Sequence, residues 1–533
     1  MLLVRGIRVD LNSAQPQQQA VHKACKLLRI SPRQAVSTGV AKLSVDARHK
    51  TPVLVYTIAI TLENEGAELA LAGSAPCVAL ARPAVFRPIV GSGQPLAHRP
   101  VVCGLGPAGL FAALALARQG YQPIVLERGP ALEDRVKAVE HFSATGQLNP
   151  EANIQFGEGG AGTFSDGKLT TRINDELCSF VTQTLLKHGA PAEIAYKQKP
   201  HVGTDLLRGV ILSIRKEIQR LGGTVHFNTK LTGLVEKGGK LAAVRTTQGE
   251  FACDALILAV GHSARDTFLT LAQQGLPLEC KPFSVGFRAE HLQTEIEKSL
   301  YHAAAGHPAL PRGEYQLSHH VGQRCVYTFC MCPGGQVVAS ASEEGGALTN
   351  GMSYHARDGK NANAAVVVSV DGSDFGGDPL KAIQFQRELE QAAFRAGGGG
   401  YQAPAQTVDS FLQAGSSLNL KRVQPTYDRG VQAANLGSLL PQQLADTLRT
   451  GLTAFDRKLR GYAAPDTVLT GLETRTSSPV RLVRGQDLQC EGMLGLYPCG
   501  EGAGYAGGIV SAAVDGLRCA QALMAAHPPR SDS

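Results

Sequence analysis

The spacing of apolar residues predicts a small α+β unit over residues 1–92. Apolar and polar positions alternate along Leu2–Asp10 and Val53–Leu62, which is typical of half-buried strands. Between these runs, Gln17–Leu28 has apolar residues at helical spacing. The stretch Gly91–Pro100, GSGQPLAHRP, combines glycine, proline and polar residues, so we interpret it as a linker.

A second pattern begins at residue 101 and predicts a strand, a glycine turn and a helix. A short apolar run leads into Gly104-x-Gly106-x-x-Gly109, and Pro107–Gln119 is rich in Ala and Leu. In this motif the first glycine permits a tight turn and the second lets the backbone approach a pyrophosphate. The third allows the helix to pack closely on the strand. The pattern therefore predicts a Rossmann-type dinucleotide site with phosphates at the helix N-terminus.

An acidic residue stands where the ribose of such a dinucleotide is bound. The next predicted strand, Gln122–Leu126, ends at Glu127, which lies 21 residues past Gly106. A carboxylate at about this spacing accepts hydrogen bonds from ribose hydroxyls. The motif serves both NAD and FAD, so other parts of the chain must decide between them.

Two later stretches favour FAD. An amphipathic helix at Thr204–Leu221 is followed by a strand, a two-stranded excursion and a buried strand, Ala255–Val260, that ends at Gly261. Such an insertion is typical of FAD domains of the glutathione-reductase-like superfamily. Near the C-terminus a strand at Leu494–Cys499 runs into Gly500-Glu501 and a helix that opens near Gly508. In that superfamily this element binds the ribityl chain, and the helix N-terminus stabilises negative charge on the reduced flavin.

A rival interpretation takes Gly502-x-Gly504-x-x-Gly507 as a second dinucleotide motif. Only 26 residues follow Gly507, so no second strand or ribose acid can be placed after it. We therefore expect one dinucleotide site.

A glycine-rich segment, Phe156–Arg172, comes close to a nucleotide-triphosphate P-loop. Leu169 stands where a P-loop has the Ser or Thr that binds Mg²⁺, and Asp166 adds a carboxylate to the phosphate cradle. No helix follows at once. We interpret the segment as a loop that closes over the isoalloxazine and pyrophosphate, where Lys168 could neutralise phosphate.

The chain resembles an uncharacterised family of FAD-dependent dehydrogenase-like proteins, described as NAD(FAD)-utilising dehydrogenases. The resemblance rests on long motifs, among them GLGPAGLFAAL, NIQFGEGGAGTFSDGKLTTR, ETRTSSPVR and YPCGEGAGYAGGI. It implies a flavoprotein and names no substrate. The residues expected to hold FAD are Gly104, Gly106, Pro107, Ala108, Gly109, Glu127, Arg128, Gly159, Gly160, Gly162, Thr163, Ser165, Asp166, Lys168, Gly261, Gly500, Glu501, Gly507, Gly508 and Ile509.

The resulting fold class is α/β, with a discontinuous Rossmann-type, glutathione-reductase-like FAD domain at residues 99–278 and 466–533. An α+β substrate domain is inserted at 279–465, and a small basic α+β domain precedes at 1–92. In the insert, strands are expected at Cys325–Cys330, Gln336–Ser340 and Ala364–Val370, with a helix at Pro379–Arg395. The stretch AGGGGYQAPAQ, 396–406, is expected to be a flexible loop.

Arginines that could clamp a substrate carboxylate or phosphate are the first catalytic candidates. The candidates are Arg475, Ser477, Arg481, Arg288 and Arg357, and for each of them a fold-holding hydrogen bond is the alternative. No Ser–His–Asp order, H-E-x-x-H or C-x-x-C is present, so redox chemistry through the flavin is the expectation. Cys330 and Cys332 form a C-x-C without a second pair, so no metal is predicted.

Charge and composition bear on which partners and which compartment we expect for the protein. The net charge is +7, and residues 1–98 carry eleven Lys/Arg against five Asp/Glu but only two aromatics, Tyr56 and Phe86. That is too few aromatics for a base-stacking surface. Twelve scattered cysteines suit the cytoplasm, and no run approaches the length of a membrane span.

The expected function is an FAD-dependent oxidoreductase that transfers hydride between flavin N5 and a small-molecule substrate or NAD(P)H. Two alternatives remain open at this point. One is a flavin-dependent enzyme that modifies RNA and docks it on the basic N-terminal domain. The other is a non-enzymatic flavin-binding sensor or assembly protein. Substrate, direction, oxygen reactivity and oligomeric state are left open by the sequence.

Overall fold

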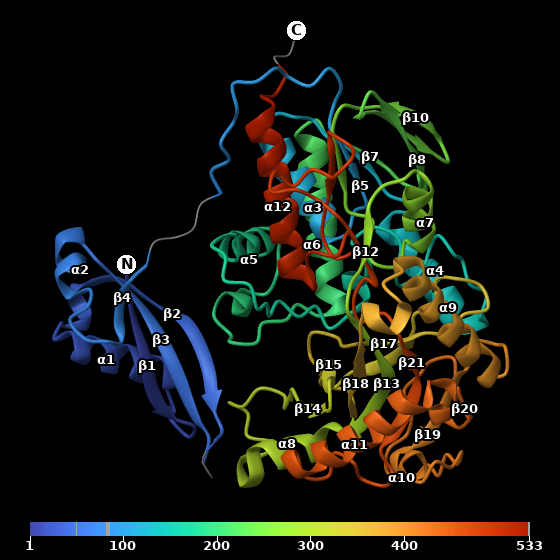
Figure 1. Ribbon diagram of the computed structural model, residues 1–533. Coiled ribbons are helices and arrows are strands. Elements are labelled where there is room, and N and C mark those ends of the chain that lie inside the picture. The colour runs from blue at the N-terminus through green and yellow to red at the C-terminus, as the bar shows by residue number, and fades with distance from the viewer. Residues whose placement is uncertain (49–50, 82–85, 531–533) are drawn as a thin grey trace.

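The computed structural model describes residues 1–48, 51–81 and 86–530. They form a small N-terminal domain beside a larger, mixed α/β body that contains two main sheets (Figure 1).

The N-terminal domain is a four-stranded antiparallel sheet with two helices. Its elements are β1 (Leu2–Asp10), α1 (Pro16–Leu28), β2 (Ala35–Asp46), β3 (Val53–Leu62), α2 (Glu65–Leu71) and β4 (Val78–Leu80). The order β2-β3-β1-β4 with antiparallel neighbours is the split βαβ arrangement of ferredoxin-like domains. Its edge strand β2 joins the body through Leu43, whose backbone bonds Tyr196 and Gln198 at 2.7 and 2.8 Å.

A five-stranded parallel sheet forms the upper part of the body in Figure 1. Its order is β23-β11-β5-β6-β7. When the five strands are numbered along the chain and read from β7, this order is 3-2-1-4-5, which is typical of doubly wound dinucleotide folds. The strands are β5 (Val101–Cys103), β6 (Ile124–Leu126), β7 (Thr224–His226), β11 (Leu256–Leu258) and β23 (Leu496–Pro498).

Helices and a small sheet cover the two faces of the parallel sheet. One face packs on α3 (Pro107–Arg118), α6 (Thr204–Arg220) and α12 (Ile509–Ala526), and α5 (Leu177–Lys187) packs on α12. The other packs on α7 (Arg265–Gln273) and on a three-stranded antiparallel sheet of β8 (Leu231–Lys237), β9 (Lys240–Thr246) and β10 (Gly249–Ala252). Helix α4 (Leu132–Thr145) leads from β6 toward the glycine-rich segment.

The second main sheet has seven strands in the order β14-β15-β18-β13-β21-β19-β20. Its strands are β13 (Phe283–Leu292), β14 (Ser318–Val321), β15 (Arg324–Cys332), β18 (Asn361–Val370), β19 (Ala403–Thr407), β20 (Val431–Ala433) and β21 (Val468–Glu473). The remaining elements are α8 (Gln293–Tyr301), α9 (Pro379–Ala396), α10 (Val408–Leu412), α11 (Gln442–Lys458) and the strand pairs β12 (Leu278–Cys280) with β22 (Val480–Leu482) and β16 (Gln336–Ala339) with β17 (Thr349–Met352).

Two features of this region differ from the sequence-based expectation. Strand β21 belongs to the seven-stranded sheet, so the chain leaves that sheet after Glu473 rather than at residue 465. Residues 403–407, expected within a flexible loop, form β19 because they pair with both β20 and β21. Such pairing partners are distant in sequence, and local glycine content does not reveal them.

Helix α12 is long and apolar enough to cross a membrane by length and composition alone, with a mean hydropathy of 1.3 over 18 residues. The expectation that no run approaches the length of a membrane span is therefore wrong for this helix by that criterion. Two thirds of that window, 67%, is buried inside the protein, where α12 packs against α3 and α5. A core helix passes the same test of length and composition.

Candidate functional site

The turn before α3 brings backbone closer together than any side chain would allow. Gly104 has φ +98°, and a Cβ there would lie 2.3 Å from the carbonyl oxygen of Ala259. A Cβ on Gly109 would lie 1.8 Å from the carbonyl oxygen of Gly104. Within the described part of the chain, the N–H groups of Gly106, Ala108 and Gly109 have no acceptor. The N-terminus of α3 therefore presents free donors, the arrangement that binds phosphate.

Glu127 fixes the end of β6 to this turn. Its carboxylate accepts hydrogen bonds from the N–H groups of Leu105 at 2.7 Å, Gly129 at 3.0 Å and Gly157 at 3.2 Å. The side chain is 4% exposed. The predicted ribose acid thus lies directly beneath the glycine turn, and a carboxylate has further lone pairs to offer a ribose hydroxyl.

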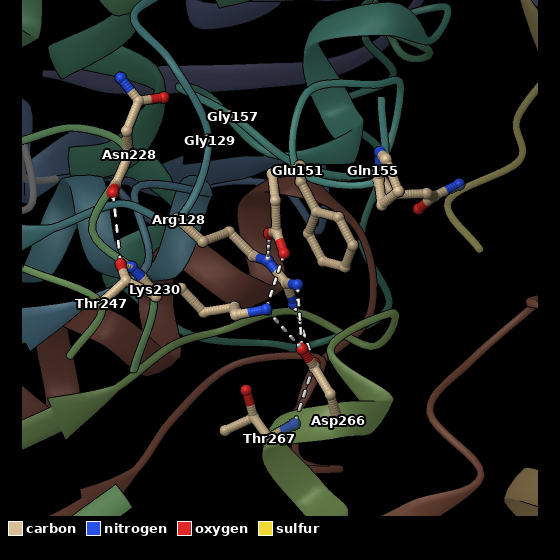
Figure 2. Close-up of polar contacts among 12 residues, drawn as sticks. Arg128, Gly129, Glu151, Gln155, Gly157, Asn228, Lys230, Thr247, Asp266 and Thr267 are labelled. Atoms are coloured by element: carbon tan, nitrogen blue, oxygen red, sulfur yellow. Dashed lines mark hydrogen bonds and ion pairs between the residues drawn. The ribbon is translucent and has the colours of Figure 1, made fainter. Parts of the chain in front are cut away.

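Arg128 lies in a ring of four charges at the outer edge of this region (Figure 2). Its guanidinium donates to Glu151 at 2.7 Å and to both oxygens of Asp266 at 3.0 Å, and it stacks 3.8 Å above the ring of Phe156. Lys230 closes the ring with contacts of 2.7 Å to Glu151 and 3.4 Å to Asp266. This ring joins the segment after β6, the loop between α4 and the glycine-rich segment, the residue before β8 and helix α7, so Arg128 is engaged in protein contacts.

The glycine-rich segment lies directly over the turn of α3. The N–H of Gly159 donates to the carbonyl of Leu105 at 2.8 Å. A Cβ on Gly160, which has φ +64°, would come within 2.9 Å of the Gly106 Cα. A Cβ on Gly162 would come within 3.3 Å of the Ile509 side chain at the start of α12. The segment therefore bridges the N-termini of α3 and α12.

A buried arginine that the sequence analysis missed holds this segment from behind. Arg135, on α4, is fully buried and donates to the carbonyls of Asn153, Ile154, Glu158 and Gly160 at 2.6 to 3.0 Å. Burial lowers its pKa to about 9, so it stays charged at neutral pH. The helix pattern of α4 indicates no role for a single arginine, because its acceptors lie 18 to 25 residues away.

Several predicted cofactor residues of the segment are engaged within the protein. The hydroxyl of Ser165 donates to the carbonyl of Gly162 at 2.7 Å, and that of Thr163 donates to the carbonyl of Glu158. Asp166 binds Arg357 at 2.9 Å and Lys168 at 3.0 Å. Although burial opposes it, these two cations hold the pKa of Asp166 below its usual range. Two predicted cofactor residues and one predicted substrate residue therefore form one ion cluster.

The N-terminus of α12 is open by comparison. Gly507 and Gly508 are exposed, and a Cβ on either would meet no atom within 4 Å. The adjoining loop is close-packed, since a Cβ on Gly500 would lie 2.8 Å from that of Ala108 on α3. A Cβ on Gly502 would lie 2.4 Å from the carbonyl oxygen of Gly261. The structure thus gathers the predicted residues of 104–109, 159–162, 261 and 500–509 in one place.

Comparison with known proteins identifies the family. A family model described as "FAD-dependent protein, C-terminal domain-like" matches residues 282–476, and a domain of unknown function matches residues 1–61. An uncharacterised protein of Clostridium beijerinckii is 47% identical over 506 residues, covering 94% of this chain and 95% of that protein. The chain belongs to a family of FAD-dependent proteins.

Solved structures of low similarity are also found. L-amino acid deaminase from Proteus vulgaris matches with 10% identity and a TM-score of 0.35, covering 84% of this chain and 95% of that one. Glycerol-3-phosphate dehydrogenase from Bacillus halodurans, complexed with FAD, matches with 12% identity and a TM-score of 0.33, covering 83% and 67%. At these TM-scores the likeness carries no argument about this FAD-dependent protein.

The donor set of the site fits the cofactor of this FAD-dependent family. The free N–H groups at the start of α3 suit an anionic pyrophosphate, and the positive end of the α12 dipole suits an electron-rich ring edge. Glu501 follows Gly500, where a ribityl chain is expected. Burial raises its pKa to about 7, while Lys281 and the N–H of Gly508 act in the opposite direction.

Three of the arginine candidates in this FAD-dependent protein are already paired with carboxylates. Arg288 binds Glu473, Arg357 binds Asp166, and Arg475 binds both oxygens of Glu390 at 2.7 and 2.9 Å. Ser477 accepts a hydrogen bond from Lys281, a residue that sequence reasoning missed. For the three arginines the fold-holding alternative describes the observed contacts.

One group of potential metal ligands exists among the described residues. Cys499, Asp515 and Cys519 are buried, with ligand atoms within 4.8 Å of one another. Arg484 donates to both oxygens of Asp515, at 2.6 and 3.0 Å, and Gly500 donates a third bond. A cation is therefore already supplied to Asp515 by the arginine.

Proposed function

We propose that this protein is an FAD-dependent oxidoreductase that transfers hydride between flavin N5 and a small-molecule substrate or NAD(P)H. The observation that supports it best is the meeting of two glycine-lined helix N-termini, α3 and α12, under one glycine-rich segment. Membership in an FAD-dependent family agrees with this. When bound, FAD supplies a two-electron acceptor that no side chain can provide.

In this proposal the chain's residues bind and orient the cofactor. The N–H groups of Gly106, Ala108 and Gly109 hold the pyrophosphate, and Glu127 holds the ribose. Glu501 and the N-terminus of α12 take the ribityl chain and the ring edge. Arg135 fixes the covering segment, so the site needs little reorganisation and excludes water on that side.

A single methyl group tests the pyrophosphate assignment. Gly106 has φ −76°, and a Cβ there would meet only the Gly160 Cα, at 3.7 Å. Gly106→Ala is thus compatible with the protein's own packing but places a methyl where the pyrophosphate approaches. We expect FAD affinity, measured by titration of the apoprotein, to fall about tenfold or more. Gly209→Ala on α6, with no atom within 4 Å, is the matched control.

The visible absorption spectrum of the purified protein, followed by anaerobic titration with NADH and NADPH, tests the oxidoreductase assignment. A flavin spectrum that bleaches with one nicotinamide and recovers with an acceptor is expected. A colourless protein that cannot be reconstituted with FAD contradicts the proposal. A flavin that is never reduced by any donor favours the sensor alternative instead.

Location and nucleic-acid binding are further parts of the proposal. All twelve cysteines are free, which suits the cytoplasmic location we propose. In the N-terminal domain Tyr56 is 4% exposed, and Phe86 packs 5.2 Å from the ring of Phe180. Neither ring is offered for stacking on bases, so no observation favours the RNA-modifying alternative.

A further inference from the structure

Two cations lie side by side near the N-terminus of α12. Lys281 directly follows β12, and Arg481 lies on β22. In this ribbon Glu279 pairs with Arg481, and the N–H of Lys281 bonds the carbonyl of Pro479 at 2.9 Å. Because side chains alternate along strands, Lys281 and Arg481 lie on the same face as diagonal neighbours. The ribbon contacts the loop before α12, since the Ser478 hydroxyl donates to the carbonyl of Gly502 at 2.9 Å.

Neither cation has a carboxylate partner. Among the residues that the structure describes, no carboxylate oxygen lies within 4.0 Å of Lys281 or Arg481. Lys281 donates one side-chain hydrogen bond, to Ser477, although an ammonium has three protons. The Nε of Arg481 is buried without any partner, and its guanidinium lies 5.5 Å from the centre of the Tyr505 ring.

The other arginine candidates differ from Lys281 and Arg481 in having carboxylate partners. Arg288, Arg357 and Arg475 each have a carboxylate at hydrogen-bond distance, so their charges are neutralised inside the protein. Lys281 and Arg481 are partly buried as well, but no carboxylate of the described residues is at ion-pair distance from either of them. A partly desolvated cation is costly unless an anion meets it. Two such cations on one face suit an anionic group.

We propose that Lys281 and Arg481, with the hydroxyl of Ser477, bind a carboxylate group of the substrate. This rests on the proposed oxidoreductase function, which requires a substrate beside the N-terminus of α12. An arginine fork and an ammonium suit the two oxygens of a carboxylate. Glu501 lies on the same side and is coupled electrostatically to Lys281. A doubly charged phosphate is repelled by that carboxyl more strongly than a singly charged carboxylate is.

The pyrophosphate of the cofactor is the other possible source of negative charge. The free N–H groups at the start of α3 already suit it, and the loop 500–504 contacts α3 through Gly500 and the ribbon through Gly504. Lys281 and Arg481 stand where the chain passes from the parallel sheet to the seven-stranded sheet and back. Experiment can separate the two sources, because only one of them is part of the cofactor.

Calorimetric titration of the purified protein with propionate, propionamide and inorganic phosphate tests the site. Lys281→Met and Arg481→Met remove one cation each, and Lys281→Arg keeps the charge. Lys298→Met is the matched control, since Lys298 is exposed on α8 and pairs only with Glu295 in the described structure. The affinity for FAD is measured for each variant by titration of the apoprotein.

We expect propionate to bind and neutral propionamide not to bind. Each Met variant lowers propionate affinity about tenfold, while Lys281→Arg and Lys298→Met leave it within about threefold. Affinity for FAD stays within about twofold in all variants. The proposal is overturned if propionate affinity is the same in both Met variants as in the wild type, or if phosphate binds more tightly than propionate.

Two further outcomes separate this inference from the proposed function. A loss of FAD affinity without a loss of propionate affinity assigns the cations to the cofactor and overturns the inference while supporting the proposed function. A protein that holds no FAD but binds propionate through Lys281 and Arg481 contradicts the proposed function and supports the anion site.

Discussion

The N-termini of α3 and α12 lie next to each other but leave very different amounts of room. At α3, added Cβ atoms on Gly104 and Gly109 would lie 2.3 and 1.8 Å from backbone oxygens. At α12, added Cβ atoms on Gly507 and Gly508 would meet nothing within 4 Å. The first set of glycines serves close backbone packing, and the second leaves an approach open. The difference matches a closed cradle for phosphate and an open side where a reacting molecule can enter.

The largest effect on stability is expected from removing the buried charge of Arg135, which holds the glycine-rich segment over the N-terminus of α3. Arg135→Met leaves at least four carbonyls of the covering segment without a donor in a buried place. We expect the free energy of unfolding to fall by about 4 kcal/mol, measured in urea, with FAD affinity reduced as well. Arg220→Met, at the end of α6, is the control. An unchanged midpoint of urea unfolding in Arg135→Met would show that the hydrogen bonds of Arg135 do not hold the segment.

A methyl group within the closed turn is expected to have the next largest effect. In Gly109→Ala the Cβ meets the Gly104 carbonyl, so the helix must move away from the turn. We expect a loss of about 3 kcal/mol in the free energy of unfolding. Gly209→Ala should instead gain up to about 1 kcal/mol, because its helix position is open. Equal effects of the two substitutions would refute the claim that the α3 turn requires glycine.

Glu501, in the loop before α12, is expected to make the stability of the protein depend on pH. Burial raises its pKa from 4.5 to about 7, so the folded protein binds a proton that the unfolded chain has lost between these values. Its contribution to stability is therefore present below about pH 4.5 and is lost as the pH rises toward 7. Allowing for its partial exposure, we expect about 2 kcal/mol. Unfolding of wild type and Glu501→Gln across this range measures it, and parallel pH curves would contradict it.

The smallest effect is expected on the open side. Gly508 has φ +81°, so Gly508→Ala adds backbone strain of about 1 kcal/mol but no collision. Thermal unfolding should detect a small loss of stability in a protein that still binds FAD. A loss as large as that of Gly109→Ala would mean that the α12 N-terminus is not open, and the contrast between the two helices would fail.

Local patterns predicted the elements of this site but not the contacts among them. The spacing from Gly104 to Glu127 predicted a dinucleotide cradle, because each role in that motif depends on a fixed local distance along the chain. The bounds of β1 and β3 followed from alternation alone. The expected boundary at residue 465 assigned strand β21 to the FAD domain, because its partners β13 and β19 are remote in sequence.

The charged residues show most clearly what the sequence could not predict. Arg288, Arg357 and Arg475 looked available because nothing near them in sequence indicates Glu473, Asp166 or Glu390 as partners. Lys281 was missed because a single lysine after a short strand belongs to no sequence motif that would mark it as functional. Which charges are neutralised depends on the folded chain, and only the structure separates paired arginines from unpaired cations.

The joint construction of the site from α3 and α12 also sets when it can form. During synthesis the turn at Gly104, Arg135 and the covering segment are made early, whereas the start of α12 at Ile509 follows after most of the chain. N-terminal parts of a chain can fold while later parts are still being translated. Under the proposed function, FAD can load only after α12 has been made and has docked beside α3.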